Sequence, residues 1–138
     1  MEALFQQVLD RYPDKVKLVI KQFPLARHKY ARKAAQAALA ANVQGKFWEF
    51  HNKLFENYQS LDSAKIQDMA KELGFDMNKF AKDIKSAAIR TQIMKDIVNG
   101  KQVGVRGTPT VFINCKLVKT NSLFKLYQVI AAEIGKKE

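Results

Sequence analysis

Residues 105–112 read Val-Arg-Gly-Thr-Pro-Thr-Val-Phe. Pro109 has no backbone N–H to donate to a sheet, so it belongs at the start of a strand, which we place at residues 110–113. The bond before Pro109 can be trans, opening an edge strand, or cis, in a tight turn beside a site. Residues 114–115 (Asn-Cys) then form a two-residue turn, and residues 116–119 return as the second strand of a hairpin.

Helical patterns fill most of the chain on either side of this hairpin. Residues 16–23 are the exception, because the continuous apolar run at 18–20 is typical of a strand covered on both faces. The crossover from that strand to the hairpin is far longer than one βαβ unit needs, so we expect residues 27–103 to form mostly a helical insertion. Helices are expected at residues 3–11, 27–42 and about 45–58, after N-caps at Asp62 and Asp76, around 89–97, and from 123 to 134.

Composition limits the class of protein. The chain has 138 residues, 47% hydrophobic and 27% charged, which indicates one globular domain. It has no apolar run long enough to span a membrane and no signal-peptide pattern at its N-terminus. A single cysteine, Cys115, excludes an intrachain disulfide and a Cys-x-x-Cys pair. His28 and His51 do not form a zinc site of familiar spacing, so we expect no metal.

The proline motif and several shorter stretches together resemble one family. Residues 107–110 (Gly-Thr-Pro-Thr), followed by 111–114 and a hairpin, resemble the cis-proline loop of thioredoxin-fold proteins. Further stretches narrow the resemblance to DsbA-like disulfide oxidoreductases over nearly the whole chain. These stretches are Tyr12-Pro13, Phe23-Pro24-Leu25 with His28 and Ala31, Gln44 to Glu49, Leu54-Phe55, and Leu73 to Asp76.

The resemblance implies a thioredoxin-like α/β fold, as a single truncated domain over residues 1–138 with an inserted helical subdomain. It implies thiol–disulfide exchange with unfolded or partly folded protein substrates, in the periplasm or another extracytoplasmic compartment, without a metal or dissociable cofactor. In the family, the loop before the proline lies opposite the cysteine pair and contacts the substrate backbone. The substrate-binding residues implied here are therefore Arg106, Gly107, Thr108 and Pro109.

The chain departs from the family at its start. Family members begin with a strand and carry Cys-x-x-Cys at the start of the helix that residues 3–11 would continue. Exchange needs an activated thiolate and a second thiol to resolve the mixed disulfide. We therefore predict no catalytic residue and no redox activity for this chain as given. Cys115, in the hairpin turn, is expected to be an incidental, partly exposed thiol.

The absent strand would lie between residues 16–23 and residues 110–113 of a thioredoxin-like sheet. Its absence would leave an unpaired edge on each neighbour, which is a liability for aggregation. Either the two strands close on each other or another chain completes the sheet. We expect a homodimer or a domain swap, because burying these edges is the simplest repair.

Two functions of other classes stay open. One is a non-catalytic peptide-binding or scaffold protein on the same fold, using the proline loop and an aromatic cluster. The other is a nucleic-acid or anionic-surface binder, because residues 11–33 contribute +7 of the net +11 charge. Few aromatic residues interleave with these cations for base stacking, so a solvated basic face is favoured over nucleic-acid binding. The aromatic cluster comprises Phe47, Trp48, Phe50, Phe55 and Tyr58.

Overall fold

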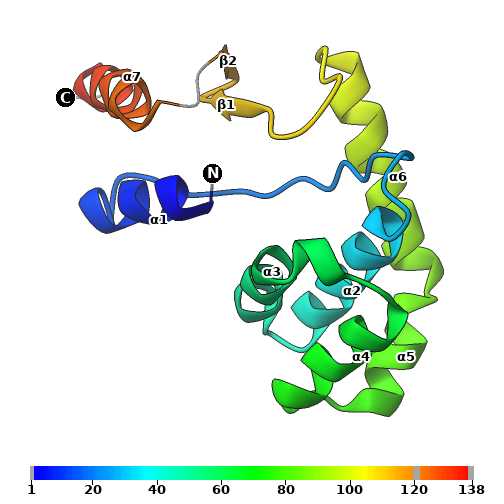
Figure 1. Ribbon diagram of the computed structural model, residues 1–138. Coiled ribbons are helices and arrows are strands. Elements are labelled where there is room, and N and C mark those ends of the chain that lie inside the picture. The colour runs from blue at the N-terminus through cyan, green and yellow to red at the C-terminus, as the bar shows by residue number, and fades with distance from the viewer. Residues whose placement is uncertain (1, 120–121, 137–138) are drawn as a thin grey trace. The chain divides into compact units, whose positions relative to one another are not determined.

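The computed structural model describes residues 2–119 and 122–136. The chain divides into two compact units (Figure 1). Lys21–Arg106 forms the helical unit, and Met1–Ile20 together with Gly107–Glu138 forms the strand unit. The architecture is helix-rich with one two-stranded antiparallel sheet among the described residues, in keeping with the α/β class expected from the sequence.

The helical unit consists of consecutive helices around one apolar core. Its largest fully buried side chains include Phe50, Phe80 and Ile66. Alanines of the second helix are buried against this core, so the neighbouring helices approach its backbone closely. The elements are α2 (Ala31–Val43), α3 (Phe47–Glu56), the short 3₁₀ helix η1 (Tyr58–Ser60), α4 (Ser63–Glu72), α5 (Met77–Ile84) and α6 (Ala87–Gln102).

Side-chain caps determine where three of these helices begin. Asp62 accepts a hydrogen bond from the backbone N–H of Lys65 at 2.7 Å, and Asp76 accepts one from Lys79 at 3.0 Å. Both N-caps predicted from the sequence are thereby confirmed. Ser86 caps α6 in the same way through the N–H of Ile89, at 3.2 Å. Each cap satisfies a donor that the first helical turn leaves unpaired.

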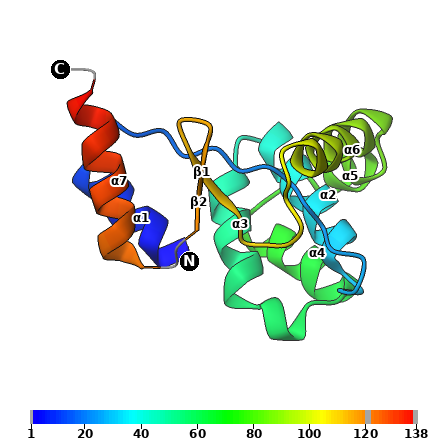
Figure 2. The same cartoon turned by 90° about the horizontal axis from the view of Figure 1, so that it is seen from above.

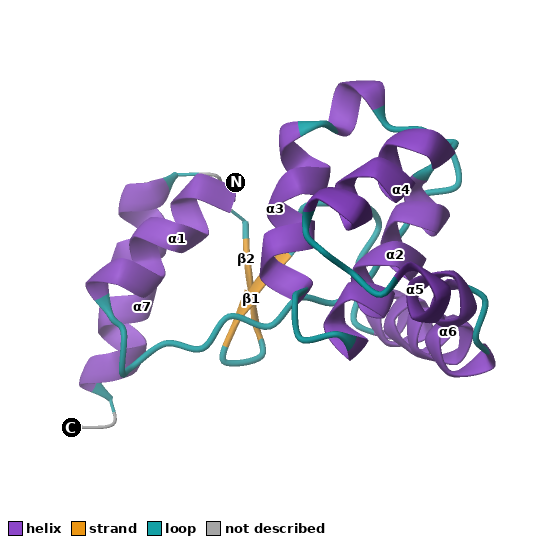
Figure 3. Ribbon diagram, turned by 90° about the horizontal axis from the view of Figure 1, so that it is seen from below, coloured by secondary structure: helices purple, strands orange, loops and turns teal. Residues whose placement is uncertain are grey.

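The strand unit brings together elements from the two ends of the sequence. Helices α1 (Glu2–Arg11) and α7 (Leu123–Gly135) lie side by side (Figures 2 and 3). The rings of Tyr12 and Tyr127 meet edge to face, with their centroids 6.3 Å apart. Strands β1 (Val111–Ile113) and β2 (Lys116–Val118) form the hairpin.

The hairpin turn has the conformation that two-residue turns require. Asn114 and Cys115 both have positive φ, 46° and 65°. Two successive residues of this kind match the type I′ turn, whose twist suits the flanking strands. The predicted hairpin is confirmed, with each strand slightly shorter than expected.

The structure differs from two predictions made from the sequence, one strand and one helix start. Residues 16–20 are extended but form no ladder, and residues 21–25 are likewise outside any strand, so the strand predicted at 16–23 is absent. A strand is defined by its pairing partner, and the only ladder among the described residues joins β1 to β2. The helix predicted from residue 27 starts at Ala31, because residues 26–30 form turns.

Candidate functional site

The predicted site residues form an exposed loop immediately before β1. Arg106, Thr108 and Pro109 are exposed and Gly107 is half-buried. The Thr108–Pro109 peptide bond is cis. The hydroxyl of Thr110 donates to the carbonyl of Gly107 at 2.7 Å, which closes the loop on itself.

The boundary between the two units falls within this loop. Arg106 is the last residue of the helical unit, whereas Gly107, Thr108 and Pro109 belong to the strand unit. The structure therefore places three of the four predicted residues together in the strand unit, directly before the first strand. We call residues 107–110 the proline loop.

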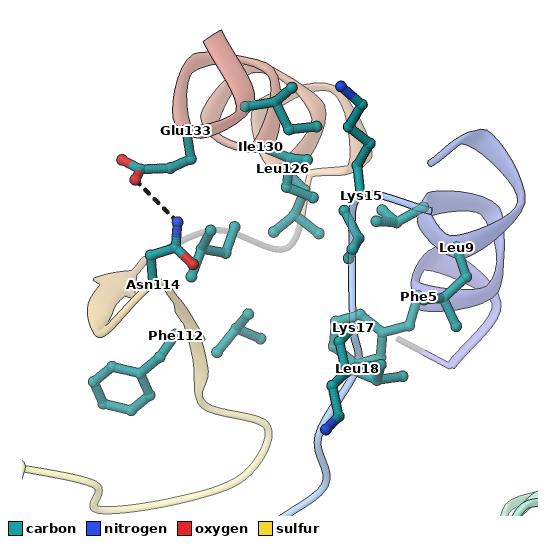
Figure 4. Close-up of a pocket in the computed structure, with 15 residues that line it drawn as sticks. Phe5, Leu9, Lys15, Lys17, Leu18, Phe112, Asn114, Leu126, Ile130 and Glu133 are labelled. Carbon is teal, nitrogen blue, oxygen red and sulfur yellow. Dashed lines mark hydrogen bonds between the residues drawn. The ribbon is translucent and has the colours of Figure 1, made fainter. Parts of the chain in front are cut away.

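A groove lies beside β1, between it and residues 15–18, in the position where the sequence predicted that a strand of the sheet is absent. It is a cavity of about 190 Å³ within the strand unit. β1 forms one wall and residues 15–18 the other, with helices α7 and α1 completing it (Figure 4). Its apolar lining includes Phe5, Val8, Leu9, Leu18, Leu126 and Ile130.

Glu133 at the rim of this groove is held by three donors. Its carboxylate accepts from Lys116 Nζ at 2.7 Å, Lys136 Nζ at 3.1 Å and Asn114 Nδ2 at 3.2 Å. These hydrogen bonds, that of Lys116 above all, lower the pKa of Glu133 to about 2. The carboxylate therefore stays ionised at neutral pH, and it ties α7 to the hairpin turn.

A second carboxylate organises the helical unit. Asp96 is 5% exposed and accepts the backbone N–H of Gln22 at 2.8 Å and the side-chain amide of Gln92 at 2.9 Å. The ammonium group of Lys21 lies 3.7 Å from the same carboxylate. Asp96 thus fixes the start of the unit's chain against α6, a contact between residues 74 positions apart that no local pattern signals.

Cys115, His28 and His51 lie apart from the proline loop in their local environments. Cys115 is exposed in the hairpin turn, as expected. His28 is exposed, while His51 is buried with its ring 5.3 Å from Phe47 and 4.8 Å from Phe55. The described part of the chain contains no group of metal-binding side chains, and none of its helices has the length and apolarity needed to cross a bilayer.

The aromatic and basic features predicted from sequence are dispersed. Phe50 belongs to the core of the helical unit, whereas Trp48, Phe55 and Tyr58 are 43%, 50% and 65% exposed. The cations of residues 11–33 are mainly exposed and divide between the two units.

Comparison with known proteins adds sequence and structural similarity. A family model described as "Thioredoxin" matches residues 1–131. Two curated relatives are Na⁺/H⁺ antiporters NhaA 1. The protein of Mycolicibacterium vanbaalenii is 32% identical over 111 residues, covering 78% of this chain and 18% of the antiporter. That of Salinispora arenicola is 34% identical over 100 residues, covering 72% and 15%. The chain thus spans less than a fifth of these relatives' length.

Solved structures match over almost the whole chain. A thioredoxin-like oxidoreductase from Silicibacter pomeroyi has a TM-score of 0.81 at 25% identity, covering 98% of this chain and 77% of that protein. The thiol-disulfide exchange protein α-DsbA2 from Wolbachia pipientis has a TM-score of 0.84 at 25% identity, covering 96% and 72%. Proteus mirabilis ScsC, with a TM-score of 0.82 at 21% identity, shares the fold, covering 100% of this chain and 76% of ScsC.

Proposed function

This chain belongs to the thioredoxin family, and we propose that it is the substrate-contacting part of a DsbA-like thiol–disulfide oxidoreductase. In this proposal the loop of Arg106, Gly107, Thr108 and Pro109 contacts the backbone of an extended protein substrate. The observation that carries it is the exposed proline loop directly before β1, in a chain whose solved neighbours include a thiol-disulfide exchange protein.

The exposure of the proline loop and its internal hydrogen bond support this role. Thr108 and Pro109 are open to solvent, so a substrate backbone can reach them without a rearrangement. The hydrogen bond from Thr110 to the Gly107 carbonyl restrains the loop before a substrate arrives. A restrained loop loses less conformational entropy on binding than a free one.

The single cysteine determines what this chain does not do. Disulfide exchange passes through a mixed disulfide that a second thiol resolves, and the sequence has only Cys115. We therefore propose that these 138 residues bind substrate but do not turn it over. The two oxidoreductase neighbours are longer than this chain, which covers 77% and 72% of them.

The same proposal includes the domain organisation and the compartment. Residues 27–103 are mostly a helical insertion within one thioredoxin-like domain, and the helical unit Lys21–Arg106 supports that division. Because protein disulfides persist mainly in oxidising compartments, we propose that the protein acts in the periplasm or another extracytoplasmic space.

Two measurements on the ¹⁵N-labelled chain test this function. We expect no turnover in an insulin-reduction assay. Addition of reduced, S-carboxymethylated lysozyme, an unfolded probe, should shift the amide resonances of Gly107, Thr108 and Thr110. Thr108→Arg should abolish these shifts, whereas Thr91→Arg, at an exposed position of α6, should leave them intact. Insulin turnover by this chain, or shifts confined to other regions, would overturn the proposal.

A non-catalytic scaffold is the second candidate, and the single cysteine favours it. The scaffold function makes the same prediction for binding by the proline loop. The two functions differ in what they predict for the whole protein, because a scaffold would bind unfolded chains without reducing or oxidising them. The insulin assay on the longest natural form of the protein separates the two functions.

A further inference from the structure

Helix α6 buries one side in the helical unit and exposes the other. Ile89 and Ile93 belong to the core of that unit, and Ile97 packs against it. The three isoleucines recur every four residues, so they share one side of the helix. α6 runs along one edge of the unit (Figures 1 and 2), and its 16 residues extend for about 24 Å. A second helix of about four turns has room to lie along the exposed side.

The exposed side of α6 carries an apolar stripe. Met94 and Val98 lie one turn apart and are 48% and 46% exposed. Ala87, seven residues before Met94, is exposed as well. Spacings of seven and four residues keep the three side chains in one line along the helix, as in the contact seam of a helix pair. The stripe therefore has the geometry of a helix contact surface that the described part of the chain leaves open to solvent.

Cations border this stripe on both sides. At about 100° of rotation per residue, Arg90 and Lys95 fall on opposite sides of the line through the stripe. In coiled-coil pairs, charged residues at such flanking positions set the choice of partner. Lys101 adds a third cation one turn beyond Val98. The side chains of Arg90, Lys95 and Lys101 are all exposed, so a partner can reach them.

No carboxylate of the described residues neutralises these three cations, because none of the three takes part in an ion pair there. Arg90 donates to the backbone carbonyl of Lys85 at 2.5 Å, a neutral partner that leaves its charge uncompensated. The single acidic residue of α6, Asp96, is buried and accepts from Gln22 and Gln92. The exposed side of α6 therefore attracts carboxylates and repels ammonium groups.

The residue types of this side favour a protein helix as the occupant. Helices that bind at a membrane surface insert large apolar residues such as tryptophan, phenylalanine and leucine, and α6 contains none of these. Methionine, in contrast, adapts its shape to the irregular surface of a protein partner. A second copy of this chain is repelled, because it carries the same net charge of +11.

We propose that the exposed side of α6 docks an acidic amphipathic helix of another protein. The apolar residues of that helix pack along Ala87, Met94 and Val98, and its carboxylates lie opposite Arg90 and Lys95. This is recognition of a helix by its apolar face, in which the flanking charges select the partner. The surface lies wholly within the helical unit and uses no residue of the proline loop, so the inference stands apart from the proposed function.

The test uses a fluorescein-labelled helical peptide, three copies of Leu-Ala-Ala-Leu-Glu-Gln-Glu with blocked ends, and fluorescence anisotropy. We expect saturable one-to-one binding. Replacing every glutamate with lysine should weaken binding at least tenfold, because the cations then face cations. Replacing the central glutamine with proline keeps the charges but breaks the helix, and should weaken binding about tenfold or more. Absence of binding, or equal affinity for the proline peptide, would overturn the proposal.

Two positions of α6 provide matched protein variants. Met94→Glu places a carboxylate in the stripe and should weaken binding of the glutamate peptide at least tenfold. Asn99→Glu makes the same charge change at an exposed position outside the stripe, and should leave binding within about threefold at physiological ionic strength. Equal weakening by both variants would overturn the proposal, because net charge alone would then attract the peptide.

A third variant keeps the test decisive if Met94→Glu does not fold by far-UV circular dichroism. Lys95→Glu changes an exposed side chain beside the stripe. It should shift preference from the glutamate peptide toward the lysine peptide, because one flanking cation becomes an anion. An unchanged preference would contradict the proposal.

Two further measurements distinguish the other occupants. Vesicles of phosphatidylcholine and phosphatidylglycerol should sediment with the parent chain and with Met94→Glu to the same extent. Loss of vesicle binding in Met94→Glu, without peptide binding by the parent chain, would overturn the proposal in favour of a membrane. Sedimentation velocity should give the same value for both proteins, and a dimer that only the parent chain forms would overturn it in favour of a second copy.

Discussion

The helical unit and the strand unit differ in how completely each buries its apolar surface. The contiguous core of fifteen buried residues lies wholly within the helical unit. In the strand unit, the buried hydrophobic side chains among the described residues are Val8, Leu126 and Ile130. The helices of the first unit are consecutive in sequence, so each meets its neighbours through short connections. The second unit depends on non-local pairing and has an open groove where that pairing stops.

The difference indicates that the helical unit resists local opening more than the strand unit does. A closed core resists opening, whereas an extended segment without backbone hydrogen bonds opens at low free energy. Both the proline loop and the groove belong to the less closed unit. Each prediction below tests one side of this contrast.

The largest effect is expected from the centre of the helical core. Phe80 is fully buried and packs against Phe75 and Phe50, with ring centroids 5.3 and 5.8 Å away. Phe80→Ala should lower the free energy of unfolding by about 3–5 kcal/mol. Urea unfolding followed by the fluorescence of Trp48, the single tryptophan, measures it. Phe124→Ala, at a side chain 68% exposed in the strand unit, should change it by less than about 0.5 kcal/mol. Equal losses of unfolding free energy in Phe80→Ala and Phe124→Ala would contradict the difference between the two units.

Removing Asp96 should give the next largest loss. Asp96→Ala leaves the N–H of Gln22 without its acceptor and should cost about 1.5–3 kcal/mol, the range for hydrogen bonds to charged groups. The same urea titration applies, with Asp68→Ala at an exposed position of α4 as the matched control. If both variants unfold at the same urea concentration, Asp96 does not anchor the unit.

A smaller loss is expected at the start of α6. Ser86→Ala removes the acceptor for the N–H of Ile89 and should destabilise the chain by about 1 kcal/mol. Ser86→Asp keeps an oxygen in that position and should restore most of the stability. Thermal melts monitored by circular dichroism compare the three proteins. Failure of aspartate to rescue would show that the serine acts through packing rather than capping.

The smallest effect is the pH dependence of Glu133 in the strand unit. Its pKa in the folded chain, about 2, lies below its ordinary value of 4.5. The stabilisation is therefore present above pH 4.5 and is lost as pH falls toward 2. Glu133→Gln should lower the urea midpoint at pH 7, and the two midpoints should converge near pH 2. A difference that is constant across this range would show that the ionised carboxylate is not the cause.

Features set by neighbouring residues were predictable from the sequence. The caps at Asp62 and Asp76 and the Asn114–Cys115 turn depend on local chemistry, and the structure confirms them. The extended conformation of residues 16–20 also follows from their composition, but their pairing does not, because a ladder needs a partner that no local pattern specifies.

The candidate site shows the same limit. The exposed proline loop follows from a contiguous motif. The groove requires α1, β1 and α7 to meet, and Glu133 contacts Lys116 across 17 positions. The gap between residues 16–23 and 110–113 was expected from the absent strand, but its lining helices and the contacts of Glu133 arise from tertiary folding, which no local pattern predicts.

Residue-resolved amide hydrogen exchange of the free chain tests the central contrast most directly. The account predicts rapid exchange at Lys17–Ile20 and at Phe112, whose N–H groups have no partner among the described residues. The amides of α2 and α5, around the closed core, should be the most protected. Protection at residues 17–20 and 112 equal to that of α2 would contradict the account, because it would mean that these edges are already paired.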